Sequence, residues 1–158
     1  MFLFRLRSQL TRIWLRVFGP RWTVGCLAVI QDEQSRVCLL KHKGRVKPWG
    51  LPGGLVAWPE TPEEGLRREL HEELNWSLQS TGQTDVGLRL VRTCVSDKFT
   101  MLEIVFAAER PATAAEISSW KIQASEISDL GWFTRGEIAR LEGILERHRE
   151  LLLNFLPV

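Results

Sequence analysis

Apolar residues recur at helical spacing at both ends of the chain. Between residues 2 and 18 they fall every three or four positions, and Gly19-Pro20 ends the run. Near the C-terminus the same spacing follows a T-x-x-E capping pattern at Thr134 and Glu137. The stripe residues are Leu3, Leu6, Leu10, Ile13 and Val17, then Leu141, Ile144, Leu145, His148, Leu151, Leu152 and Phe155. This spacing predicts an amphipathic helix at each end.

Short apolar runs between these helices predict strands, because each run is bounded by polar or Gly and Pro residues. They cover residues 23–30, 36–43, 85–96, 99–109 and 129–133. The polar stretch "QDEQS" joins the first two runs, which favours a hairpin. Residues 44–54, rich in Gly and Pro, predict a loop with at most a short strand, and residues 111–128 an irregular connection.

A central helix begins after Thr61, where Pro62 suits the first turn and Glu64 completes a capping box. At about 100° per residue, Leu66, Leu70 and Leu74 form one buried stripe. Three glutamates form an arc that begins at the edge of this stripe, in the order Glu73, Glu69, Glu72. Like charges at these spacings destabilise a helix, so a partner of opposite charge is expected to offset their repulsion.

The position of the acidic arc favours a cation as that partner. A purely solvated acidic face would place Glu73 away from the leucines. Carboxylates beside a buried stripe are costly to desolvate, and hard divalent cations are their natural partners. The helix therefore predicts a metal-binding face.

Composition is consistent with one soluble globular domain of mixed α/β class. The chain has 158 residues, 44% apolar and 25% charged. Five of its 21 basic residues lie in the first 31 positions, where no acid occurs, so the remaining 16 face 19 acidic residues. A mildly acidic body does not favour nucleic-acid binding. Cys26, Cys38 and Cys94 have no metal-ligand or disulfide spacing and are interpreted as packing residues in a reducing compartment, the cytoplasm.

The stretch from Gly54 to Trp76, "GLVAWPETPEEGLRRELHEELNW", resembles the Nudix box, G-x5-E-x7-R-E-U-x-E-E-x-G-U, where U is a bulky apolar residue. The preceding "WGLPG" is also similar to the usual lead-in. One position departs, because Asn75 stands where the family has glycine. Asparagine is the next most tolerant residue of the left-handed conformation, so this change is conservative.

The resemblance implies an α/β/α sandwich with a mixed sheet over residues 21–158, and it leaves residues 1–20 as a separate basic amphipathic helix. It also implies a hydrolase of nucleoside diphosphates linked to another moiety, dependent on Mg²⁺ or Mn²⁺. Glu69, Glu72 and Glu73 match the metal-binding carboxylates, joined by Gly53. Arg68 matches the arginine that orients them, and Glu60 the acid that supports this network.

Other site residues are predicted with alternatives left open. The general base is Glu69 or a loop acid, Glu126 or Glu116, although loop acids are often only solvated. Basic residues after the second strand either face the phosphates or are solvated: Lys41, Lys43, Arg45 and Lys47. Gly53 and Gly54 allow close approach of the backbone to substrate. Trp58 and Trp120 are candidates to contact a base or sugar, or else core residues, and His148 is interpreted as structural.

The substrate is not specified by the sequence. Subfamilies that prefer ADP-ribose or dinucleoside polyphosphates often carry a proline or tyrosine beyond the box, and residues 88–97 have neither. Nucleoside triphosphates, nucleotide sugars and similar conjugates remain. Two other functions stay open: a catalytically weak ligand sensor, and docking through residues 2–18 onto a membrane surface, a partner or a second copy in a homodimer.

Overall fold

The computed structural model describes residues 23–77, 87–96 and 101–157. Seven strands and four helices lie in these ranges. In chain order they are β1 (Thr23–Val29), β2 (Val37–His42), β3 (Trp49–Gly50), β4 (Gly53–Leu55), α2 (Pro62–Leu74), β5 (Leu88–Ser96), β6 (Met101–Ala108), α3 (Ala114–Ser119), β7 (Ile127–Phe133), α4 (Arg135–Arg140) and α5 (Glu146–Phe155).

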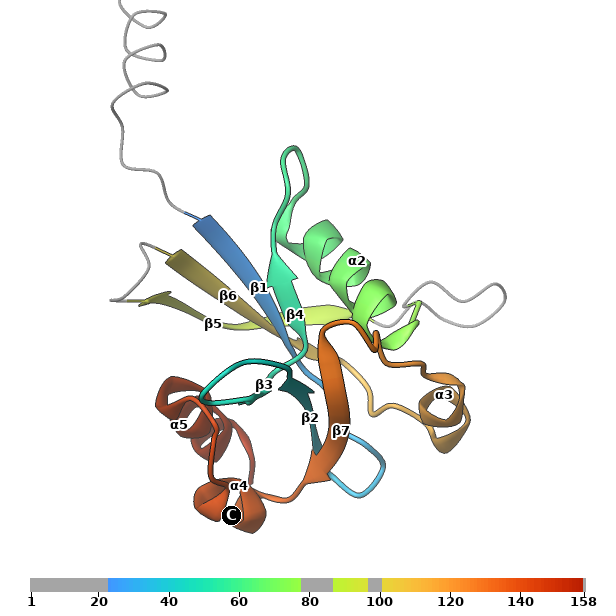
Figure 1. The fold of residues 1–158 in the computed structure, drawn as a ribbon, viewed down its shortest axis with the longest axis vertical. Coiled ribbons are helices and arrows are strands. Elements are labelled where there is room, and N and C mark those ends of the chain that lie inside the picture. Colours follow the sequence, from blue (N-terminus) through green and yellow to red (C-terminus); the bar gives the residue numbers. More distant parts are fainter. Residues whose placement is uncertain (1–22, 78–86, 97–100, 158) are drawn as a thin grey trace, which may run out of the picture.

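The strands form two sheets with helices on both sides (Figure 1). In the first sheet the order is β4-β1-β6-β5, with β1 parallel to β6 and antiparallel to β4. The second sheet, β3-β2-β7, is antiparallel. Helix α2 lies on one side and α4 and α5 on the other. The predicted α/β/α sandwich with a mixed sheet is therefore confirmed.

The predicted hairpin of residues 23–30 and 36–43 is wrong, because β1 and β2 belong to different sheets. They meet only where the chain turns, through a bridge between Gln31 and Val37. The buried Asp32 carboxylate holds this turn by accepting the backbone N–H groups of Gln34 and Arg36. Both strands are apolar on both faces, so each is covered on two sides in the centre of its own sheet.

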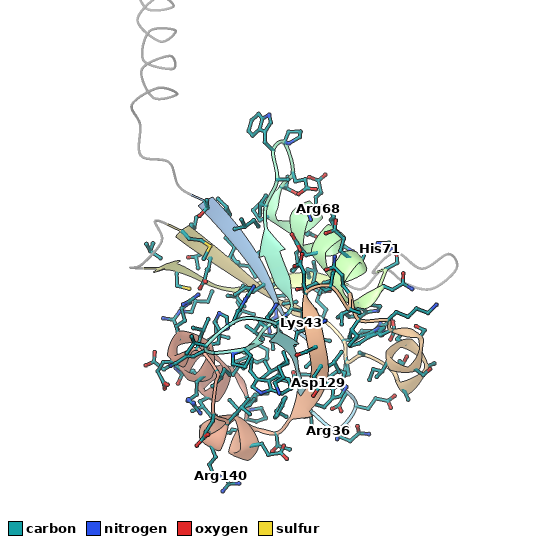
Figure 2. All side chains as sticks on the ribbon, in the orientation of Figure 1. Arg36, Lys43, Arg68, His71, Asp129 and Arg140 are labelled. Atoms are coloured by element: carbon teal, nitrogen blue, oxygen red, sulfur yellow. The ribbon has the colours of Figure 1, made fainter. Side chains whose placement is uncertain are left out.

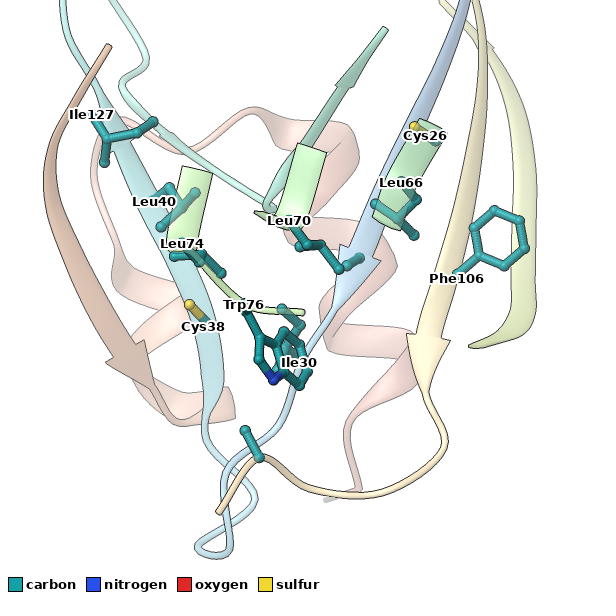
Figure 3. Packing of buried hydrophobic residues seen from close by; sticks show 12 residues of the cluster. Cys26, Ile30, Cys38, Leu40, Leu66, Leu70, Leu74, Trp76, Phe106 and Ile127 are labelled. Carbon is teal, nitrogen blue, oxygen red and sulfur yellow. The ribbon is translucent and has the colours of Figure 1, made fainter. Parts of the chain in front are cut away.

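Alternate residues of β1 supply two hydrophobic clusters. Cys26 and Ala28 point toward α2 and pack with its leucines, as Figure 3 shows for Cys26 and Leu66. Leu27 and Val29 point the other way, toward α4 and α5. Cys26 and Cys38 are fully buried, as expected of packing residues.

Helix α2 forms where its sequence predicts it. Thr61 and Glu64 make the reciprocal capping-box hydrogen bonds. At the other end Asn75 adopts the left-handed conformation, with φ of 53°. Its backbone N–H donates to the carbonyl oxygens of Leu70 and His71 in the last turn. The prediction for Asn75 is thus confirmed.

Two helical predictions need correction. The C-terminal stripe forms two helices, α4 and α5, because the chain turns at Gly143, whose φ is 75°. Trp49 of β3 donates its N–H to Gly143 there, which pins the break. The connection at 111–128 contains α3, which begins at a third capping box, Thr113 and Glu116.

The predicted N-terminal helix, residues 2–18, lies outside the described residues, as does its boundary at residue 20. None of the helices in the described ranges has both the length and the apolar character needed to cross a membrane.

Candidate active site

Two glycines bring β4 close to both β1 and α2. A Cβ atom on Gly53 would lie 2.1 Å from the carbonyl oxygen of Cys26, and the φ of Gly53 is +128°. A Cβ atom on Gly54 would lie 2.5 Å from Cδ of Glu69. Because neither position has room for a side chain, the Glu69 carboxylate lies directly against the backbone of β4.

Arg68 is the cation that offsets the repulsion within the acidic arc. Its Nε donates to Glu60 at 2.8 Å, and one terminal nitrogen donates to Glu69 at 2.9 Å and to Glu72 at 3.3 Å. The other terminal nitrogen reaches the carbonyl oxygen of Leu55 at 2.9 Å. These bonds lower the pKa of Glu60 and raise that of Arg68. Figure 2 shows Arg68 on α2, facing the segment that follows β4.

Glu73 is the buried member of the arc, with 5% of its surface exposed. It accepts the backbone N–H of Gly53 at 2.7 Å. Burial raises its pKa to about 8, the N–H of Gly53 opposes that rise, and the charge of Glu69 adds to it. Arg45 and Glu126 act on the same carboxylate with opposite signs.

The donor set fits a hard divalent cation. The donors are the carboxylate oxygens of the acidic arc, of which Glu73 is buried. Mg²⁺ and Mn²⁺ prefer such oxygen ligands. Within the described ranges, no three acidic, histidine or cysteine side chains already converge in metal-binding geometry. Arg68 instead holds Glu69 and Glu72, so these carboxylates lie in the right region but point to the guanidinium.

A segment from Trp120 to Ile127 places Glu126 near the arc. Lys121 and Gln123 donate their N–H groups to the carbonyl oxygens of Leu74 and Glu73. At its other end the Glu126 carbonyl accepts the N–H of Lys43, and the Lys43 ammonium bonds the carbonyl oxygen of Ala124. The segment is therefore attached both to the end of α2 and to the end of β2, where Figure 2 labels Lys43.

A family model described as NUDIX domain matches residues 19–155. This chain belongs to the Nudix family. It is a Nudix hydrolase, an enzyme that acts on nucleotide-linked small molecules.

Curated relatives agree with this assignment. The chain is 27% identical to a nucleoside triphosphatase, NudI, of Enterobacter sp. strain 638, with 76% of this chain and 86% of that protein covered. It is 28% identical to a MutT-like protein of Streptomyces ambofaciens, covering 76% and 69%. A MutT Nudix hydrolase structure from Burkholderia pseudomallei superimposes with a TM-score of 0.66 at 26% identity, covering 84% and 97%.

The other predicted site residues of this Nudix domain differ from one another in exposure and in contacts. Lys41 places its ammonium 5.6 Å from the centre of the Trp49 ring. Trp58 is 94% exposed, in the loop between β4 and α2. Trp120 packs between Trp76 and Trp132, at ring-centroid distances of 5.0 and 5.8 Å. Of the two loop acids, Glu116 accepts hydrogen bonds from Arg110 and from the backbone N–H of Thr113. These bonds lower the pKa of Glu116 to about 2.

Sequence reasoning missed a second polar cluster, on the opposite face of the first sheet from α2. Glu103, 4% exposed, forms an ion pair with Arg147 of α5 at 2.5 Å and accepts a hydrogen bond from the thiol of Cys94. The next residue of α5, His148, is 6% exposed, and neither of its ring nitrogens has a hydrogen-bond partner among the residues that the structure describes. An acid amid the apolar run of β6 is the one signal that could have indicated this pairing.

Proposed function

We propose that the chain hydrolyses a phosphoanhydride bond of a nucleoside diphosphate derivative with Mg²⁺ or Mn²⁺, and that nucleoside triphosphates are its first substrates to test. The observation that carries the proposal is the Arg68 network, which holds Glu60, Glu69 and Glu72 next to the buried Glu73. The name of the Enterobacter relative, a nucleoside triphosphatase, supports the choice of substrate.

The residues of the arc have distinct roles in this proposal. Glu69, Glu72 and Glu73 would hold the cation, with the Gly53 backbone beside them. A bound divalent cation would neutralise phosphate oxygens and orient the attacking water. Arg68 orients the carboxylates while the site is empty of substrate and keeps Glu69 against Gly54. Glu69 or Glu126 accepts a proton from the water, since both act on Glu73 and therefore lie near the same space.

The contacts of the other candidates refine their roles. The Lys43 ammonium bonds the carbonyl oxygen of Ala124, so the proposed role of Lys43 is to position the segment that carries Glu126. Arg45 is the loop cation whose charge acts on Glu73, so it is the better candidate to face a phosphate. Lys41 and Trp58 stay candidates for contacting the nucleoside. The ring of Trp120 packs against the rings of Trp76 and Trp132 instead, as a core residue would.

The test is phosphate and pyrophosphate release from a panel of nucleoside triphosphates, nucleotide sugars and dinucleoside polyphosphates. We expect turnover with Mg²⁺ or Mn²⁺ that EDTA abolishes. Glu69→Gln and Glu73→Gln should each lower kcat by about a hundredfold or more, since each removes a carboxylate charge from the proposed metal site. Glu63→Gln, on the exposed side of α2, is the matched control.

Two results would contradict the proposal. Normal turnover in both Gln variants would place the chemistry elsewhere. Absence of hydrolysis across the panel, with tight nucleotide binding retained, would support the alternative of a ligand sensor.

A further inference from the structure

Part of the first sheet presents an apolar face that no described element covers. Helix α2 packs on β1 and β4, whereas β6 and β5 continue the sheet beyond it (Figure 1). On this α2 side of the sheet, Leu90 pairs with Phe106 and Val95 with Leu102. Leu90 is 55% exposed and Val95 53%, and Leu102 beside them is only half-buried. Thr93, paired with Ile104, is the polar residue between Leu90 and Val95 on this side. Exposed apolar residues gathered on one face often mark an interaction site.

Strand β1 begins beside this face. Thr23 and Val24 are in register with Met101 and Leu102 at the start of β6. The matched Nudix domain begins at residue 19, so residues 1–18 are an addition to it. Residues 18–22 can extend about 16 Å, which exceeds the two strand spacings of about 10 Å from β1 to β5.

Residues 2–18 have the length and pattern to fill the face. As a helix, their stripe from Leu3 to Val17 would extend about 21 Å, against about 17 Å along β5 from Leu90 to Val95. On a helical wheel Arg5, Arg12 and Arg16 fall on the opposite arc, where they would stay in solvent. A second candidate to occupy the face is the segment "LQSTGQTDV" at 78–86, but it is mostly polar.

We propose that residues 2–18 dock as an amphipathic helix on the face formed by Leu90, Val95, Leu102 and Ile104 of the same molecule. The docked segment closes the apolar side of β5 and β6 that α2 leaves open. It lies on the sheet beside the hydrolase site and contributes no residue to the acidic arc.

Hydrogen exchange of the full-length protein tests the contact. Leu10→Asp places a charge in the stripe, and Ser8→Asp places the same charge on the opposite arc. We expect amide exchange in β5 and β6 to be about tenfold faster in Leu10→Asp and unchanged in Ser8→Asp, because only the first disrupts docking. Equal exchange in the wild type and Leu10→Asp would overturn the proposal.

Cross-linking then identifies the occupant. In a Cys94→Ser background, Leu90→Cys is combined with Leu6→Cys, Leu10→Cys or Ile13→Cys, and with Ser8→Cys as the control. Oxidation should give an intramolecular, monomer-sized product for at least one stripe position and none for the control. A dimer-sized product would assign the face to a second copy. Protection of β5 and β6 that appears only with phosphatidylserine vesicles would assign residues 2–18 to a membrane. Either result would overturn the proposal.

Discussion

At the scale of single residues, the site depends on missing side chains as much as on charged ones. Gly54 leaves the space that the Glu69 carboxylate occupies, and Gly53 leaves the space beside the β1 backbone. Arg68 joins Glu69, held against β4 in this way, to Glu60 and Glu72. The spacing from Gly54 to Glu69 in the sequence thus corresponds to a direct packing contact.

Gly54→Ala should therefore damage the site without a large loss of stability. The added Cβ would displace the end of a flexible side chain, Glu69, rather than backbone. We expect kcat to fall about tenfold or more, with urea unfolding little changed. Gly136→Ala in α4, where a Cβ meets only the far end of Arg140 at 3.9 Å, is the matched control. Unchanged turnover in Gly54→Ala would show that the position of Glu69 does not matter.

At the scale of elements, local signals predicted what local interactions determine. The caps of α2 and α4 are T-x-x-E patterns that the structure confirms, and the same pattern at Thr113 could have revealed α3. The sheet to which a strand belongs is not a local property. β1 was predicted to pair with β2, but it pairs with β6, more than seventy positions along the chain. The break at Gly143 likewise depends on a distant partner, Trp49.

The site follows the same division. The box residues could be predicted because most lie on one helix, where spacing determines position. The Lys43–Ala124 bond joins residues 81 positions apart, and the Glu103–Arg147 pair joins residues 44 apart. No spacing rule connects such residues, so their partners became known only from the fold.

Helix α5 buries a histidine that should make folding sensitive to acid. Burial lowers the pKa of His148 to about 4, Glu103 opposes this shift, and Arg147, Arg45 and His42 add to it. In the unfolded chain the histidine has a pKa of about 6.5. The unfolded state therefore binds the proton first, so stability is complete above pH 6.5 and falls as pH drops toward 4.

Urea unfolding at pH 7.5 and pH 5 measures this contribution. Removing the titration of His148 should spare at most about 2 kcal/mol of the stability lost between these pH values. The comparison of His148→Phe with the wild type at each pH isolates it, because other titrating groups such as Glu73 are present in both. His71→Phe, an exposed histidine of α2, is the control. An identical loss in wild type and His148→Phe would contradict the assignment.

At the scale of the whole molecule, the two sheets meet at the candidate active site. The arc lies on α2, which packs on the first sheet, whereas Lys43 and Glu126 flank strands β2 and β7 of the second. Residues 120–127 connect them, through Leu74 and Glu73 on one side and Lys43 on the other. The relative position of Glu126 and Glu73 thus depends on how this segment is attached at both ends.

Lys43→Met tests whether Lys43 attaches the segment or binds substrate. If it attaches the segment, the variant keeps the backbone bond between Lys43 and Glu126 but loses the ammonium. We then expect kcat to fall about three- to tenfold with KM unchanged, because Glu126 is less well placed while substrate contacts persist. Arg140→Met, which removes an exposed cation at the end of α4, is the control for lost charge. A large rise in KM with kcat preserved would instead make Lys43 a phosphate-binding residue. Because the attachment spans both sheets, the same variant should also speed amide exchange at Lys121 and Gln123, whose N–H groups bond the end of α2.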